Sequence, residues 1–156
     1  KVLCGGGYDA TERYIEPTLL DNPLLSSAVM TEEIFGPVFP VITLEGEGSS
    51  VDIAIRFISS REKPLALYFF GDEADGWRVV RHTSSGGGCI NDVIMHIANE
   101  NVPFGGVGNS GMGMYHDKES FEAFSHRRSI IATGTWIDLP FRYMPYKLFG
   151  LVKKIL

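Results

Sequence analysis

Leu65-Ala66-Leu67-Tyr68-Phe69-Phe70 is the stretch of this sequence that decides how the rest of the chain can fold. It is continuously apolar, and Pro64 and Gly71 bound it on either side. A short apolar run between such residues is typical of a strand that is buried on both faces. A strand of this kind needs other elements packed above and below it, so the neighbouring segments are expected to supply that cover.

The same order of elements is found on both sides of this run. A helix is predicted over 72–81, followed by the glycine triplet 86–88 and a short strand at 89–90. Upstream, the β-branched stretch 38–44 predicts a strand and 51–58 predicts a helix. Because a right-handed crossover through a helix joins two parallel strands, this order predicts an α/β fold in which helices flank a parallel sheet.

The segment 91–114 is rich in Gly, Asn and Pro and has no helical or strand period. A loop of about 20 residues is uncommon in a compact domain and is often functional. Downstream, 118–126 predicts a helix and 129–132 a short strand, after which the chain becomes an aromatic, apolar and basic tail. Two interpretations of the tail stay open, packing along the protein and contact with a membrane surface; Gly150 favours packing because it interrupts a short helix.

Composition narrows the class of protein. A chain of 156 residues with 44% hydrophobic and 21% charged residues is ordinary for one globular domain. The net charge of -5, with basic residues spread along the chain, argues against nucleic acid as a partner. Two distant cysteines predict reduced thiols and a cytoplasmic location, with membrane association through a continued C-terminal tail as the alternative. The chain opens on Lys1 without signal-peptide features, so its natural start is expected upstream.

Two motifs in this order, Thr-Glu-Glu-Ile-Phe-Gly-Pro at 31–37 and Pro-Phe-Gly-Gly-Val-Gly-Asn-Ser-Gly-Met-Gly at 103–113, resemble the C-terminal part of the aldehyde dehydrogenase superfamily. Further stretches at 61–68, 91–93 and 124–129 resemble its class 3 branch, which includes the fatty aldehyde dehydrogenases. The resemblance implies three parts, which are a partial catalytic domain at 1–127, an oligomerisation strand at 128–135 that pairs across a subunit interface, and a C-terminal tail at 136–156.

The resemblance also implies an activity, the oxidation of medium-chain, long-chain or aromatic aldehydes to carboxylic acids with NAD or NADP. In that chemistry a cysteine thiolate adds to the carbonyl, a hydride leaves the thiohemiacetal, and a glutamate-activated water hydrolyses the thioester. The family's cysteine, glutamate and oxyanion-binding asparagine precede the first motif, and no residue here matches them. The chain is therefore expected to contain no catalytic residue and to be inactive alone, as part of a homodimeric enzyme that binds a small aldehyde. A non-catalytic dimerisation piece is the alternative.

Five residues are the candidates for this site. By resemblance, Glu33 and Phe35 bind the cofactor, and the chemistry agrees because a carboxylate accepts hydrogen bonds from ribose hydroxyls and a phenyl ring can press against nicotinamide. Asn91, His96 and Phe104 are expected to line the substrate tunnel. The structural alternatives are a solvated acidic pair and a core ring for the first motif, an ordinary turn residue for Asn91, and a hydrogen-bond partner of the local backbone for His96.

Three other features are interpreted as non-functional. Residues 106–111 fit the dinucleotide fingerprint G-x-G-x-x-G, but no buried strand precedes them, so a self-contained nucleotide site is disfavoured. Cys89 lies beside the expected site, yet the sequence shows no base next to it, so it is not expected to act as a nucleophile. The histidines and cysteines lack the close pairing of metal ligands, so no metal site is expected.

Overall fold

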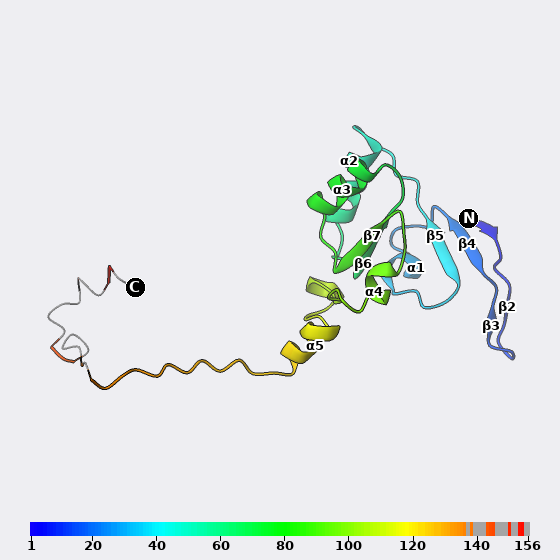
Figure 1. The fold of residues 1–156 in the computed structure, drawn as a ribbon. Helices are drawn as coiled ribbons and strands as arrows, with labels where there is room; N and C mark the ends of the chain where they lie inside the picture. Colours follow the sequence, from blue (N-terminus) through cyan, green and yellow to red (C-terminus); the bar gives the residue numbers. More distant parts are fainter. Residues whose placement is uncertain (137, 139–142, 146–149, 151–152, 155–156) are drawn as a thin grey trace. The chain divides into compact units, whose positions relative to one another are not determined.

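The computed structural model describes residues 1–136, 138, 143–145, 150 and 153–154. The chain divides into two units, residues 1–123 and 124–156, and each is described by itself. The strands of the described residues and the helices α1 to α5 lie in the first unit (Figure 1). Within the described residues, no helix is long and apolar enough to cross a membrane.

The first part of the chain forms two small sheets. A three-stranded sheet has the order β1 (Val2–Cys4), β4 (Thr18–Asp21), β5 (Val38–Val41). The β1–β4 pair is antiparallel and the β4–β5 pair is parallel, with Thr18 opposite Val38. The hairpin of β2 (Tyr8–Asp9) and β3 (Tyr14–Ile15) forms the second sheet, and α1 (Ala28–Thr31) lies between β4 and β5 along the chain.

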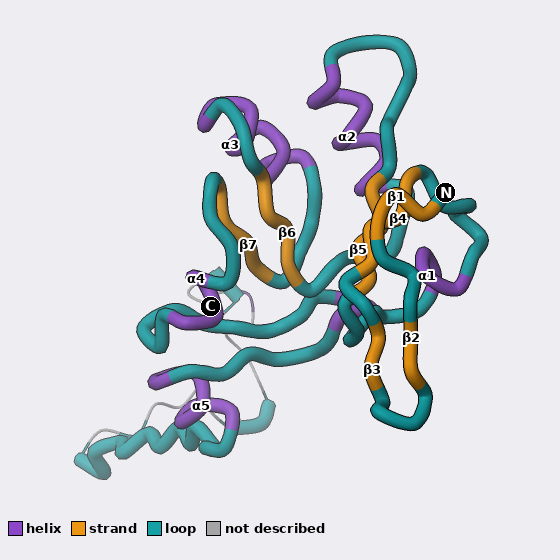
Figure 2. The backbone as a smooth tube through the Cα atoms, turned by 90° about the vertical axis from the view of Figure 1, so that its right-hand side faces the viewer, coloured by secondary structure: helices purple, strands orange, loops and turns teal. Residues whose placement is uncertain are grey.

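The second part of the chain is a strand–helix–strand unit. β6 (Ala66–Phe69) pairs in parallel with β7 (Gly87–Ile90), and α3 (Glu73–His82) connects them. α2 (Ser50–Ser59) precedes β6 and contacts α3. Figure 2 shows the two strands side by side, with α3 beyond one end of the pair. The element order predicted from the sequence is confirmed here.

Both long helices begin at side chains that satisfy their free backbone donors. The Ser49 hydroxyl accepts a hydrogen bond from the Asp52 amide at 3.2 Å, and the Asp72 carboxylate accepts from the amides of Ala74 and Asp75 at 2.9 and 3.3 Å. Such caps stabilise a helix by about 1 kcal/mol each. Arg81 and His82 lie in the last turn of α3, where positive charge complements the helix dipole.

A glycine lets α3 approach the strands closely. A Cβ atom on Gly76 would lie 2.9 Å from Ile90 Cγ2 and 2.9 Å from Phe69 Cδ1, which is closer than real contacts allow. Val79, one turn further along, is only 2% exposed. The close approach of α3 to the strands therefore depends on the absent side chain at position 76.

Three expectations about the fold are corrected. The expected parallel sheet is replaced by small sheets that are not all parallel. The β1–β4 and β2–β3 pairs are antiparallel, whereas the β4–β5 and β6–β7 pairs are parallel. The run 65–70 is not buried on both faces, since Tyr68 is 36% and Phe70 64% exposed and β6 pairs only with β7 among the described residues. The loop 91–114 contains a helical turn, α4 (Met95–Ala98), and a 3₁₀ turn, η1 (Gly108–Ser110).

The end of the chain is described only in part. α5 (Asp117–Ala123) confirms the predicted helix, which ends three residues earlier than expected. Residues 129–132 form no strand, because a strand is defined by its hydrogen-bonded partner and the described residues of this single chain provide none. The oligomerisation strand at 128–135 stays a prediction. Much of the tail at 136–156 lies outside the described residues.

An ion pair between Asp52 of α2 and Arg78 of α3 makes the stability of the fold depend on pH. The Ser49 hydroxyl, followed by the charge of Arg78, lowers the pKa of Asp52. A carboxylate with a lowered pKa stabilises the folded state above its ordinary pKa and loses that effect as the pH falls through the lowered value. Asp52→Asn should lower the thermal unfolding temperature at neutral pH, and the difference from the wild type should vanish in strong acid.

Asp75→Asn is the matched control for this measurement. It removes a carboxylate from the first turn of α3, where the described residues show no ion pair to Asp75. At neutral pH, Asp75→Asn should lower the thermal unfolding temperature less than Asp52→Asn does. If Asp52→Asn lowered the unfolding temperature equally at neutral pH and in strong acid, a role for the carboxylate charge would be contradicted.

Candidate functional site

The aromatic cluster consists of Tyr68, His96, Phe104, Tyr115 and His116. Helix α4 contacts β7, and its His96 ring lies 5.5 Å from the Tyr68 ring and 5.6 Å from the Phe104 ring, measured between centroids. The structure therefore brings together two of the three residues that the sequence assigned to the substrate tunnel, His96 and Phe104, which are eight positions apart in the sequence.

Phe104 is held by its backbone as well as by its ring. Its amide donates to the Tyr115 carbonyl at 3.0 Å, and the Tyr115 amide donates to the Phe104 carbonyl at 2.9 Å. The two rings meet edge to face at 5.5 Å, and the His116 ring stacks on Phe104 at 6.1 Å. This bridge closes residues 105–114 into a loop and holds the Phe104 backbone at the base of that loop.

The glycine fingerprint 106–111 lies within that loop. Its residues 108–110 form the 3₁₀ turn η1, and the segment before it contains α4 and the isolated Phe104–Tyr115 bridge. A dinucleotide fingerprint requires a buried strand before the glycines and a helix after them. The described context is different, as the sequence indicated.

Gly87 makes room for the imidazole of His96. A Cβ atom on Gly87 would lie 2.7 Å from His96 Cδ2, so any other residue would displace the ring or the strand. Gly87 and Cys89 point to the same face of β7, because side chains alternate along a strand. The ring therefore lies along the face of β7 that also carries the thiol.

His96 and Cys89 form a contact that the sequence analysis missed. Cys89 Sγ lies 3.6 Å from His96 Nδ1, which corrects the expectation that no base is next to this thiol. The two residues belong to different elements, a strand and a helical turn, so no local spacing could have indicated the pair. The sequence would have had to show that the segment after β7 turns back over the face that carries Cys89, and no motif indicates such a turn.

The other ring nitrogen of His96 is unpaired. His96 Nε2 is buried and has no hydrogen-bond partner among the described residues. A buried polar atom without a partner costs about 1–3 kcal/mol, so such atoms are rare in folded proteins and are often found at functional sites. This atom makes the aromatic cluster a candidate site independently of any motif.

Asn91 lies elsewhere and is engaged on both sides of its amide. Its Oδ1 accepts from the Gly71 amide at 2.8 Å, and its Nδ2 donates to the Gly71 carbonyl at 3.0 Å. These bonds join the second residue after β6 to the first residue after β7, and no hydrogen bond joins Asn91 to the cluster among the described residues. Its observed role is to hold two strand ends together, and its proposed place in the tunnel stays a prediction.

Glu33 and Phe35 lie on the segment between α1 and β5. The Phe35 ring is 90% exposed, and Glu33 is exposed with no hydrogen bond or ion pair in the described part of the chain. Phe35 is thus not the core residue that the structural alternative required. The end of the segment is anchored, since the Thr18 amide donates to the Pro37 carbonyl at 2.8 Å.

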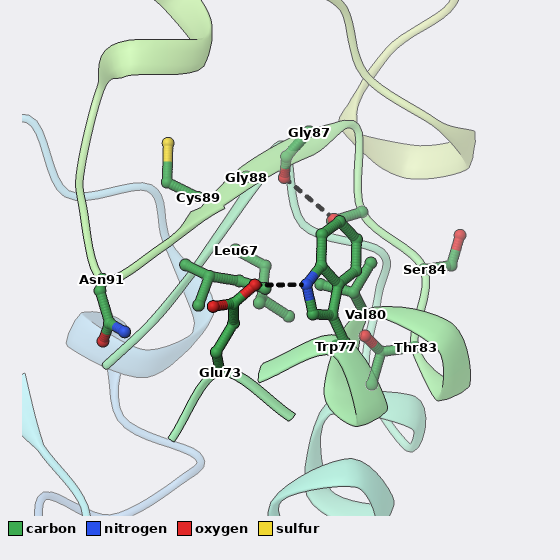
Figure 3. Close-up of a pocket in the computed structure, with 12 residues that line it drawn as sticks. Leu67, Glu73, Trp77, Val80, Thr83, Ser84, Gly87, Gly88, Cys89 and Asn91 are labelled. Atoms are coloured by element: carbon green, nitrogen blue, oxygen red, sulfur yellow. Dashed lines mark hydrogen bonds between the residues drawn. The ribbon is translucent and has the colours of Figure 1, made fainter. Parts of the chain in front are cut away.

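A cleft of about 820 Å³ lies between α3 and β7 (Figure 3). Trp77 and Glu73 line one side, joined by a hydrogen bond of 3.2 Å from the indole nitrogen to the carboxylate. Cys89 and Asn91 line the other, whereas none of Glu33, Phe35, His96 and Phe104 does. Of the five candidate residues, the cleft therefore includes Asn91 alone. No group of residues able to hold a metal ion is found in the described ranges.

Comparison with known proteins places this arrangement in a family. The model of the aldehyde dehydrogenase family matches residues 1–130. The sequence is 51% identical over 147 residues to 4,4'-diaponeurosporen-aldehyde dehydrogenase of Staphylococcus aureus, covering 94% of this chain and 31% of that protein. It is 54% identical over 132 residues to the dimeric NADP-preferring aldehyde dehydrogenase of Rattus norvegicus, covering 84% of this chain and 28% of that protein.

A solved structure agrees with the sequence relatives. The substrate-bound state of Staphylococcus aureus AldH superposes with a TM-score of 0.81 at 48% identity, covering 99% of this chain and 33% of that one. The chain belongs to the aldehyde dehydrogenase family, and it spans about a third of the length of the curated relatives it matches. Relatives that are named as family 3 members confirm the resemblance to class 3.

The hydrogen bonds of Asn91 can be tested separately from its backbone conformation. Asn91 has a φ of 57°, a region that glycine adopts without strain and alanine does not. Asn91→Gly should lower the free energy of unfolding by about 1 kcal/mol through the lost hydrogen bonds. Asn91→Ala should cost about 1 kcal/mol more because of backbone strain. Urea unfolding measures both, and equal values for the two variants would show that the conformation is not strained.

Proposed function

We propose that this chain is the C-terminal portion of an NAD(P)-dependent aldehyde dehydrogenase of class 3. The enzyme would oxidise medium-chain, long-chain or aromatic aldehydes to carboxylic acids through a cysteine thiohemiacetal. Family membership supports the reaction, and the single observation that carries the role of this chain is the exposed, unpaired Glu33 beside the exposed Phe35 ring. The nucleophilic cysteine would lie outside the chain.

The residues of the 31–37 motif fit a nicotinamide cofactor. Glu33 is an acceptor without a donor among the described residues, and a ribose offers two hydroxyl donors. Phe35 presents a flat ring that is 90% exposed, which suits a planar aromatic partner. The anchored Pro37 would hold both side chains in place. When bound, the cofactor would accept the hydride that leaves the aldehyde carbon.

The aromatic cluster supports an apolar substrate. Phe104 and His96 are half-buried and packed against each other, and their rings would line one wall of a tunnel. Asn91 would contribute by holding the strand end beside the tunnel. This wall suits aliphatic and aromatic aldehydes because both bury apolar surface against rings.

A homodimer is part of the proposal. One relative is named as dimeric, and Ile130 and Ile131 of the second unit are 71% and 90% exposed in the single chain. Two consecutive apolar side chains at such exposure are typical of a segment that another chain covers. Pairing of 128–135 with a second copy would supply that cover.

Glu33→Gln in the full-length enzyme tests the cofactor role. The amide keeps the size of the side chain but loses the charge and one acceptor, so kcat/KM for the cofactor should fall roughly tenfold. Glu32→Gln is the matched control, because Glu32 is the exposed neighbour that ends α1. Steady-state kinetics with NAD and with NADP provide the measurement. Unchanged kinetics in Glu33→Gln would remove this residue from the site.

The chain alone is expected to be inactive. Catalysis requires a thiolate, a carbonyl and a hydride acceptor held in one geometry, and the first of these would be missing. Residues 1–156 should therefore give no aldehyde-dependent NADH or NADPH, while the full-length enzyme should. Turnover by the isolated chain would contradict the proposal. Dimer formation without cofactor binding in either protein would instead favour the dimerisation piece.

A further inference from the structure

We propose that Cys89 and His96 form a thiol–imidazole pair that makes Cys89 a site of covalent addition by soft electrophiles, in particular by α,β-unsaturated aldehydes. Cys89 has no role in the oxidation proposed above. Only the choice of electrophile rests on the proposed function, since an enzyme that handles aldehydes also meets unsaturated ones. The reactivity of the thiol does not rest on it.

The geometry is that of a nucleophile beside a base. The 3.6 Å between Cys89 Sγ and His96 Nδ1 is within hydrogen-bonding reach for sulfur. An activated nucleophile also needs its base oriented by other groups. Here the Tyr68 and Phe104 rings pack against the imidazole, and Gly87 leaves the space that the ring occupies. The distance between the two atoms is therefore determined by packing and not by a free side chain.

The unpaired Nε2 is the second observation. A neutral imidazole has one nitrogen that donates and one that accepts. With Nδ1 facing the thiol as the acceptor, Nε2 carries the hydrogen, which finds no partner among the described residues. The imidazole is thus not engaged by another acceptor or donor that would compete for the thiol proton. The described contacts direct its basic nitrogen to sulfur alone.

The thiol is also accessible. Cys89 is partly exposed, and its thiol lies on the face of β7 that also carries the His96 ring. Figure 3 shows its sulfur directed away from Trp77 and Glu73. Cys4 provides an internal comparison, because it is exposed but has no hydrogen-bond partner for its thiol in the described part of the chain. Exposure alone would favour reaction at Cys4, whereas a neighbouring base favours Cys89.

The addition balances without an oxidant or reductant. The thiol proton moves to His96 Nδ1, and the sulfur lone pair forms a bond to the β-carbon of the unsaturated aldehyde. The π electrons of the carbon–carbon double bond shift towards the carbonyl as an enolate, whose α-carbon then takes the proton back from the imidazolium. The product is a thioether that keeps its aldehyde, and the imidazole returns to its neutral form.

Competition between the two thiols tests the proposal. The full-length protein is treated with limiting acrolein, or with iodoacetamide as a second probe, and peptide mass spectrometry gives the initial rates at Cys89 and Cys4. A free cysteine is only a few per cent thiolate at neutral pH, so a base should make Cys89 roughly tenfold faster than Cys4. Equal rates, or a faster Cys4, would overturn the proposal.

Two variants identify the base. His96→Gln should remove the advantage of Cys89 over Cys4. His116→Gln is the matched control, because it removes an imidazole from the same aromatic cluster whose Nδ1 faces the Val102 carbonyl at 3.1 Å and not a thiol. It should leave the ratio of rates unchanged. A ratio that persists in His96→Gln, or that falls equally in both variants, would refute a specific role for His96.

A measurement on the wild type covers the case in which His96→Gln does not fold. In concentrated urea the pair is separated, so the ratio of rates at Cys89 and Cys4 should fall to about one. A preference for Cys89 that survives unfolding would reflect local sequence and would overturn the proposal. Because the readout is the labelled peptide, a protein without aldehyde oxidation could still show the predicted preference, and the two proposals can fail separately.

Discussion

The parallel pairing of β6 with β7 is the interaction on which the rest of this unit depends. It presents one face to α3, through the close approach at Gly76, and the other to α4, through the space at Gly87. It also brings the two strand ends together where Asn91 bonds to Gly71. Every candidate group outside the 31–37 motif is positioned by these two strands or by the segment that follows them.

The aromatic cluster and the 31–37 motif present different kinds of surface. The aromatic cluster is built from rings that hold one another, so its geometry is present in the chain by itself. Glu33 and Phe35 are exposed and make no such contacts among the described residues. The first arrangement suits the wall of a tunnel and the second suits a surface that a ligand or another part of the enzyme covers. This difference agrees with a chain that spans about a third of its relatives.

Local patterns predicted the elements well and their partners less well. The strand and helix order from 38 to 90 was evident because apolar runs, caps and glycines are local signals. The antiparallel β1–β4 pair was not, since strand pairing depends on distant backbone contacts. Burial of the run 65–70 was overestimated for a similar reason, because an apolar composition says what a strand could bury and not what covers it. The Cys89–His96 contact was missed because it crosses from a strand to a turn.

The space beside Gly87 couples two positions of the sequence that have no bond between them. Because a Cβ at 87 would overlap the ring at 96, a larger residue at 87 can be accommodated only with a smaller side chain at 96. Variation at the two positions should therefore be correlated across related chains. The separation between the thiol and the imidazole is then a property of three residues, and the one that constrains it most has no side chain of its own.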